Sequence, residues 1–106
     1  MSLQSTRDVI LRTHSLAAAK AYYHDVLGLP LVADSERLVG FDTGAITLYF
    51  ELGDENGQVF DFLTDDMAAA KAKLLAAGCV VVEDNPSIPR CYLRDPFGLT
   101  FNLDLV

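Results

Sequence analysis

Hydrophobic and polar residues alternate along several short segments, and this period of two is typical of β-strands with one buried face. The alternation is clearest in residues 45–52 and 99–105, where Leu, Ile and Phe take one face. The opposite face of these segments carries Thr, Tyr, Glu, Asn and Asp. Weaker or shorter strand candidates are residues 8–13, 31–33, 38–41, 59–64, 80–83 and 90–94.

Two Ala-rich segments have helical spacing instead. The apolar positions of the first are Leu16, Ala19, Tyr23 and Val26, and those of the second are Met67, Ala70, Leu74 and Ala77, with identical spacings 51 positions later. Ser15 and Asp66 stand just before these runs and are predicted to cap the helix N-termini. Gly28 and Gly78 are predicted to end the helices.

The order of these segments predicts an internal duplication. Residues of about 7–53 and about 58–105 each read as β-α-β-β-β, with turns at 42–44 and 95–98. The helix of each repeat can cover the apolar face of its strands. We therefore predict an α+β fold in one domain, residues 1–106, whose two curved sheets surround a cleft lined by the polar strand faces.

Composition narrows the class of partner. The chain has 106 residues and a formal net charge of −7, so it lacks the basic surface that nucleic-acid binding requires. The acidic residues are dispersed, which indicates solubility or attraction for a cationic small molecule. No apolar run is long enough for a membrane span, and no secretory signal is visible, so we expect no membrane partner and a cytoplasmic protein. Cys79 and Cys91 are expected to be reduced and buried.

Two motifs carry a resemblance to a known family. SLAAAKAYYHDVLGL at residues 15–29 and YLRDPFGLTFNL at 92–103, within the paired repeats, resemble the vicinal oxygen chelate superfamily. That group includes glyoxalases, extradiol dioxygenases, fosfomycin-modifying transferases and bleomycin-binding resistance proteins. The resemblance covers essentially the whole chain and implies the same fold.

The resemblance also indicates where metal ligands would stand. Family members that bind metal place His, Glu or Gln at positions that here read Asp8, Thr47, Val59 and Asn102. Val59 cannot bind a metal ion, and Thr47 and Asn102 are weak neutral ligands. Glu51 and Asp61 could supply carboxylates only through a shifted geometry. We therefore predict no metal and no cofactor, and we assign His14 and His24 to surface or capping roles.

The polar faces of the predicted strands supply the candidate ligand-binding residues. These are Asp8, Arg12, Thr47, Tyr49, Glu51, Asp61, Tyr92, Arg94, Asn102 and Asp104. Tyr49 and Tyr92 could stack a planar ligand or fill the core. The alternation of Arg90, Tyr92 and Arg94 indicates either an exposed sheet edge or a wall that holds an anionic group. Four phenylalanines are assigned to the helix-covered core, namely Phe50, Phe60, Phe62 and Phe101, whereas Phe97 is expected to be exposed.

These observations favour a metal-free protein that binds or sequesters a planar or cationic organic ligand, as in the bleomycin-resistance branch, without catalytic residues. Such a protein could contribute to antibiotic resistance and is expected to form a homodimer. The alternative is a metal-dependent lyase or isomerase of the glyoxalase type, or a dioxygenase-like enzyme, in which Asp8 and Glu51 serve as unusual ligands. A metal-free acid–base enzyme and an interaction module without a ligand are further possibilities.

Overall fold

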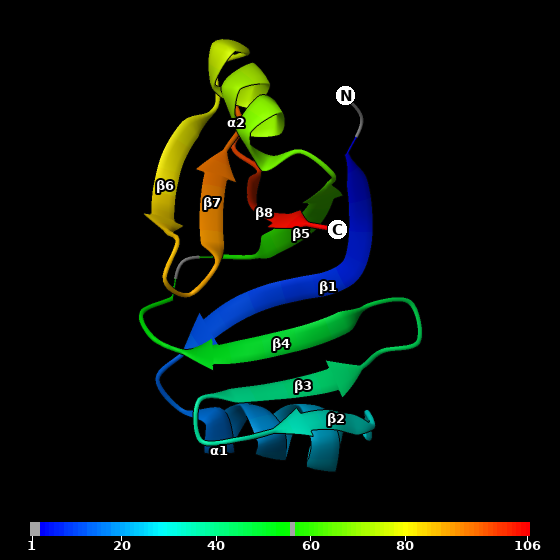
Figure 1. Ribbon diagram of the computed structural model, residues 1–106. Coiled ribbons are helices and arrows are strands. Elements are labelled where there is room, and N and C mark those ends of the chain that lie inside the picture. Colours follow the sequence, from blue (N-terminus) through cyan, green and yellow to red (C-terminus); the bar gives the residue numbers. More distant parts are fainter. Residues whose placement is uncertain (1–2, 56) are drawn as a thin grey trace. The chain divides into compact units, whose positions relative to one another are not determined.

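The computed structural model describes residues 3–55 and 57–106 and has an α+β architecture (Figure 1). It divides into two compact units, Arg7–Gln58 and Val59–Val106, the second of which also includes the described residues before Arg7. Each unit contains strands and a helix in the order β-α-β-β-β. The predicted α+β class, with the order β-α-β-β-β in each unit, is therefore confirmed.

The first unit contains four strands, with its helix between the first two strands in sequence. Its elements are β1 (Gln4–Thr13), α1 (Leu16–Lys20), η1 (Ala21–Val26), β2 (Leu31–Asp34), β3 (Leu38–Asp42) and β4 (Thr47–Leu52). The strand order is β2-β3-β4-β1. The β1–β4 pair is parallel, whereas the other two pairs are antiparallel. The first and last strands of the repeat therefore lie side by side.

The first helix starts as predicted and then changes type. The Ser15 Oγ atom accepts a hydrogen bond from the Ala18 amide at 3.1 Å, which confirms the N-cap. After Lys20 the chain continues as a π-helix, in which the Leu27 amide donates to the carbonyl of Tyr22. A π-helical turn holds more residues than an α-helical one, so a stripe extrapolated at 3.6 residues per turn drifts off the buried face. Val26, the last apolar position of the predicted stripe, is accordingly 72% exposed.

The core of the first unit lies between this helix and one face of the sheet. Val39, Phe41 and Phe50 are buried there. The ring of Tyr23 packs on them, with its centroid 4.9 Å from that of Phe50 and 5.5 Å from that of Phe41. Leu48 joins the same cluster, so the apolar face predicted for residues 45–52 is confirmed at Leu48 and Phe50, whereas Leu52 at the end of the strand is 39% exposed.

The second unit repeats the arrangement with a regular helix. Its elements are β5 (Val59–Thr64), α2 (Met67–Ala76), β6 (Val80–Asn85), β7 (Arg90–Arg94) and β8 (Thr100–Leu105). The strand order is β5-β8-β7-β6, and β5 and β8 are parallel. The Asp66 Oδ1 atom accepts from the Ala69 amide at 3.1 Å, and Gly78 has a φ of +106°, so the predicted cap and the predicted stop are both confirmed.

The core of the second unit lies between α2 and the sheet face beneath it. Cys79 and Cys91 are buried free thiols in this cluster, as predicted. Phe62 and Phe101 also belong to it. The assignment of Phe60 to the core was wrong, because the cluster under α2 does not include this position and the side chain is 36% exposed.

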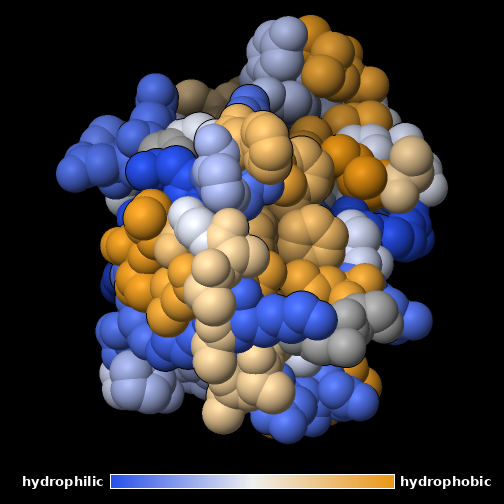
Figure 2. Space-filling view, turned by 90° about the horizontal axis from the view of Figure 1, so that it is seen from above, coloured by the Kyte–Doolittle hydropathy of each residue, from blue (hydrophilic) through white to orange (hydrophobic). Residues whose placement is uncertain are grey.

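The face of the molecule in Figure 2 carries hydrophobic and hydrophilic residues side by side. Residues Val80, Val81 and Val82 of β6 are exposed, and so is Phe97, as predicted for that hairpin. Over the described ranges 3–55 and 57–106, no helix combines the length and the apolar character that a membrane span requires.

Candidate functional site

The polar face of the first unit gathers five of the predicted site residues. The parallel register pairs Asp8 with Thr47 and Arg12 with Glu51, and Tyr49 lies between these pairs opposite Ile10. Because side chains alternate between the two faces of a strand, these residues all project away from the helix-covered core. The structure thus brings Asp8, Arg12, Thr47, Tyr49 and Glu51 onto one continuous surface of β1 and β4.

Tyr49 occupies a space that a glycine leaves open. Gly40 of β3 pairs with Tyr49 across the sheet, and a Cβ atom there would lie 2.7 Å from Cε1 of the ring. Carbon atoms pack at about 3.5–4.0 Å, so only glycine allows the ring to rest against the β3 backbone. This role of Gly40 was not predicted from the sequence, although a glycine inside the apolar segment 38–41 is a recognised sign of close approach.

The electrostatic environment keeps the Tyr49 phenol neutral. Partial burial of the side chain raises the pKa of Tyr49, and the negative charge of Asp8 raises it further. Both effects disfavour the phenolate. Tyr49 therefore presents a neutral ring and a hydroxyl donor close to a carboxylate.

The neighbouring charged pair is partly shielded from water. The Arg12 Nε atom lies 3.5 Å from Oε1 of Glu51. Gly53 follows β4 with a φ of +154°, and a Cβ atom there would lie 3.1 Å from Cδ of Arg12. The ion pair is therefore held against a backbone position that favours glycine. The positive charge of Arg12 offsets the negative charge of Glu51.

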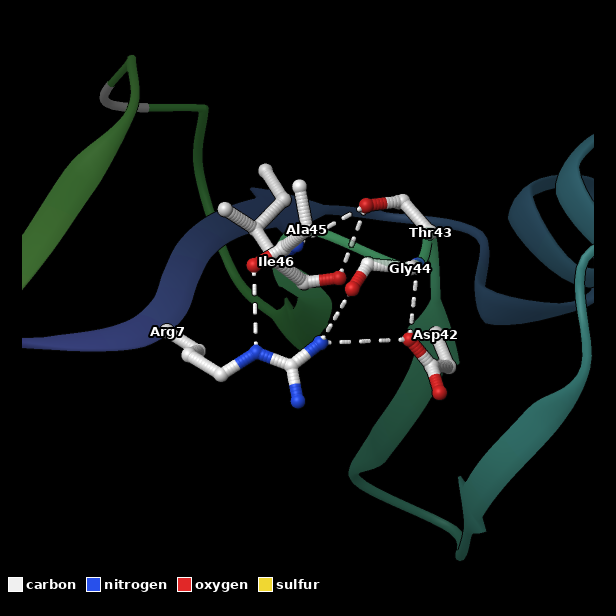
Figure 3. A network of polar contacts seen from close by, with 6 residues as sticks. All are labelled: Arg7, Asp42, Thr43, Gly44, Ala45 and Ile46. Atoms are coloured by element: carbon white, nitrogen blue, oxygen red, sulfur yellow. Dashed lines mark hydrogen bonds and ion pairs between the residues drawn. The ribbon is translucent and has the colours of Figure 1, made fainter.

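An arginine network fixes the turn that leads into β4 (Figure 3). Arg7 donates to the carbonyls of Gly44 at 2.7 Å and Ala45 at 3.1 Å, and it lies 3.6 Å from Oδ1 of Asp42. Oδ1 of Asp42 also accepts from the Gly44 amide. This network holds the hairpin between β3 and β4, and with it the start of the strand that carries the polar face. Arg7 was not among the predicted site residues.

The polar face of the second unit contains a buried hydrogen-bonded network. The amide Nδ2 of Asn102 donates to Oδ1 of Asp61 at 3.0 Å, and Oδ1 of Asn102 accepts from the Cys91 amide at 3.1 Å. Thr6 donates to Oδ2 of Asp61 at 3.2 Å. Asp61 and Asn102 are only 7% and 8% exposed. Both ends of the Asn102 amide thus join neighbouring strands of the sheet.

The remaining predicted residues of this unit lie in different environments. Tyr92 is 2% exposed, and the guanidinium carbon of Arg90 lies 5.0 Å from the centre of its ring. Arg94 is exposed and donates to Thr100, whereas Asp104 is half-buried and accepts from the Leu105 amide. The interpretation of residues 90–94 as a sheet edge was wrong, because β7 lies between β6 and β8.

The donor set at the family's metal positions does not fit a transition metal. Val59 is buried and has no donor atom, and both polar atoms of the Asn102 side chain already make hydrogen bonds. Within the part of the chain that the structure describes, no group of three or more His, Cys, Asp or Glu side chains could hold a metal ion. His14 lies at the surface against Asp54, and His24 contacts the Leu29 carbonyl after the helix, as their surface and capping roles predict.

Comparisons with known proteins agree with the motifs. A family model described as a glyoxalase-like domain matches residues 8–103. No curated protein matches the chain. A hypothetical protein from Bacillus halodurans C-125 has a TM-score of 0.73 at 11% identity, covering 100% of this chain and 96% of that one.

Two further solved structures are informative. A glyoxalase/bleomycin resistance protein/dioxygenase superfamily member from Vibrio splendidus 12B01 has a TM-score of 0.66 at 16% identity, covering 96% of this chain and 97% of that chain. At such low identity this likeness, like that to the Bacillus protein, concerns the fold alone. The Mn(II)-bound glyoxalase from Novosphingobium aromaticivorans has 25% identity and a TM-score of 0.66, covering 97% of this chain but 39% of that chain.

Proposed function

We propose that this chain, which belongs to the glyoxalase-like domain family and thus to the vicinal oxygen chelate superfamily, binds a planar organic cation on the polar face of its first unit. The observation that carries this proposal is the Tyr49 ring, which rests on Gly40 beside the charge of Asp8. A flat ring held against backbone offers a stacking surface. A nearby carboxylate favours a ligand of positive charge.

The overall charge supports the same ligand class. A formal net charge of −7 raises the local concentration of cations around the protein. The ring face of tyrosine also attracts cations through its quadrupole. Binding or sequestration of such a ligand needs no metal, which agrees with the donor chemistry of Val59 and Asn102.

A titration with matched fluorescent probes tests the proposal. Proflavine is a planar cation, and 9-anthracenecarboxylate is a planar anion of similar size. We expect proflavine to bind and the anion not to bind. Tyr49→Leu should weaken proflavine binding about tenfold, because a stacked cation–aromatic contact contributes about 1–2 kcal/mol. Tyr49→Phe should largely preserve binding, and Asp8→Asn should weaken it with a reduced dependence on salt.

Tyr22→Leu is the matched control, because Tyr22 is an exposed tyrosine of the same unit that lies on η1. This variant should bind proflavine as the unmodified chain does. Equal binding of proflavine and 9-anthracenecarboxylate, or equal losses in the Tyr22 and Tyr49 variants, would contradict the proposal.

A second candidate function is a metal-dependent lyase of the glyoxalase type. It is favoured by the 25% identity to the Mn(II)-bound glyoxalase. This function would require Asp8 and Glu51 as ligands, although Glu51 already pairs with Arg12. Elemental analysis of protein purified without chelator distinguishes the two functions. Bound manganese, zinc or iron near one equivalent would favour the lyase, and we expect only trace amounts. A homodimeric, cytoplasmic protein with a role in antibiotic resistance stays a prediction.

A further inference from the structure

A cavity of about 360 Å³ lies in the second unit, on the side of the sheet that carries α2. Its lining includes Met67 from α2 and Leu103 and Leu105 from β8. Leu103 belongs to the core cluster, on the face of β8 opposite to that of Asn102. The volume falls in the range of small-molecule pockets. None of the residues on the Tyr49 surface of the first unit belongs to its lining.

The cationic side chains around the cavity are held in ion pairs. Lys71 and Arg90 contribute two positive charges to the lining, and Asp84 and Asp104 contribute two negative ones. Lys71 donates a hydrogen bond to Asp84, which raises the pKa of Lys71. The Nη1 atom of Arg90 lies 3.3 Å from Oε2 of Glu83. An anionic ligand would lose hydration here without meeting an unpaired positive charge, because Lys71 and Arg90 already pair with Asp84 and Glu83.

We propose that this cavity binds a neutral, largely apolar small molecule with one hydrogen-bonding group. The apolar body packs on Met67, Leu103 and Leu105, and the polar group bonds to the Lys71–Asp84 pair, which offers both donors and acceptors. The paired cations and the carboxylate of Asp104 select against an anion of the same shape.

Cys91 provides a reporter within the cavity. Cys91 is one of the lining residues, whereas Cys79 belongs to the same core but is not in the lining. Burial raises the pKa of both thiols, with additional contributions from Asp84 for Cys91 and from Asp95 for Cys79. Both thiols should therefore react slowly with alkylating reagents, and only Cys91 should respond to an occupant of the cavity.

The experiment uses two probes of one skeleton. N-phenyl-1-naphthylamine is neutral and carries one N–H group, and 8-anilinonaphthalene-1-sulfonate adds a negative charge. We expect the neutral probe to bind about tenfold more tightly in a fluorescence titration. At saturation it should slow N-ethylmaleimide alkylation of Cys91 several-fold, as measured by peptide mass spectrometry, and leave the rate at Cys79 unchanged. Absence of binding, or equal protection of both thiols, would overturn the proposal.

Two exposed apolar residues give matched variants. Leu105 lines the cavity and is 56% exposed, whereas Ile88 is 51% exposed and lies outside its lining. Leu105→Thr should weaken probe binding about fivefold to tenfold, because apolar contact is lost. Ile88→Thr should have no effect. Protection of Cys91 that rises with protein concentration in the absence of probe would show that a second copy covers the cavity, and it would also overturn the proposal.

Discussion

At the scale of single residues, the Tyr49 phenol gives a measurable signature of the proposed site. Burial and the charge of Asp8 both raise the pKa of Tyr49 above its ordinary value of 10.0. In an alkaline absorbance titration, the component that Tyr49→Phe removes should therefore have a midpoint above 10.0. Asp8→Asn should lower that midpoint part of the way, because burial remains.

The same shift has a consequence for stability. A raised pKa in the folded state means that folding favours the protonated phenol, so this contribution is complete below pH 10.0 and is lost as the pH rises through the folded value. Tyr49→Phe should abolish this part of the alkaline loss. Tyr22→Phe, at an exposed tyrosine, is the control and should leave the loss in place. A midpoint at or below 10.0 for the Tyr49 component would refute this account.

Gly40 should be energetically coupled to Tyr49. Gly40→Ala introduces a Cβ atom 2.7 Å from the Tyr49 ring, so either the ring or β3 must move. We expect a loss of about 1–3 kcal/mol in the free energy of unfolding, as for overpacking in cores. In a Tyr49→Leu background the cost should fall by at least about 1 kcal/mol. Urea unfolding of the four chains measures the coupling, and equal costs in both backgrounds would contradict it.

Asn102 should contribute to stability through its hydrogen bonds. Asn102→Leu keeps a similar volume but removes the acceptor of the Cys91 amide and a donor to Asp61. We expect a loss of about 2–4 kcal/mol in unfolding free energy, because buried polar groups lose their partner. Asp104→Asn, two residues along the same strand and less buried, should cost less than about 0.5 kcal/mol. Similar costs for the two variants would show that the Asn102 network contributes little.

At the scale of elements, local sequence chemistry predicted where the helices begin and end better than it predicted which side chains are buried. Ser15 and Asp66 cap the helices because their side-chain oxygens accept hydrogen bonds from backbone amides only three residues further along the chain. Such local contacts can be predicted from the sequence. Val26 is exposed because the chain enters a π-helix, which the spacing of apolar residues does not reveal. Whether Phe60 is buried depends on where α2 packs on the sheet, and this packing cannot be predicted from the local sequence.

The grouping of the candidate site residues could be predicted from the sequence, whereas their packing and hydrogen bonds could not. The alternation along two strands placed Asp8, Tyr49 and Glu51 on one face, and the parallel register confirms this grouping. The support of the Tyr49 ring by Gly40 was not predicted, because it depends on the register of β3 against β4. Asn102 is recognisable from its residue type as a weak metal ligand, but the hydrogen bonds of its amide to two neighbouring strands depend on the register of the sheet.

The contribution of the Asp66 N-cap of α2 to stability can be measured. Asp66→Ala removes the acceptor of the Ala69 amide and should lower the unfolding free energy by about 1 kcal/mol. Asp66→Asn keeps a side-chain oxygen at the cap and should restore most of that loss. Thermal unfolding followed by circular dichroism gives both values. An Asn variant as unstable as the Ala variant would mean that charge, rather than the cap hydrogen bond, is responsible.

At the scale of the whole molecule, β1 is shared by the two units. Its residues up to Thr6 group with Val59–Val106, and its residues from Arg7 group with the first unit. The hydrogen bonds of two adjacent residues follow this division. Thr6 donates to Asp61 of the second unit, and Arg7 donates to the Gly44 carbonyl of the first. Neither unit can unfold completely without releasing part of one continuous strand. We therefore predict a single cooperative unfolding transition.

Hydrogen exchange in the Asp66→Ala variant tests this cooperativity, because the substitution lies in one unit only. Phe41 and Leu103 are buried strand residues in the cores of the first and second units. If their amides exchange through global unfolding, the protection of both should fall by the same free energy, about 1 kcal/mol. Ser15→Ala should give the reciprocal result from the first unit. A change confined to Leu103 in the Asp66 variant, and to Phe41 in the Ser15 variant, would instead show that the repeats unfold independently.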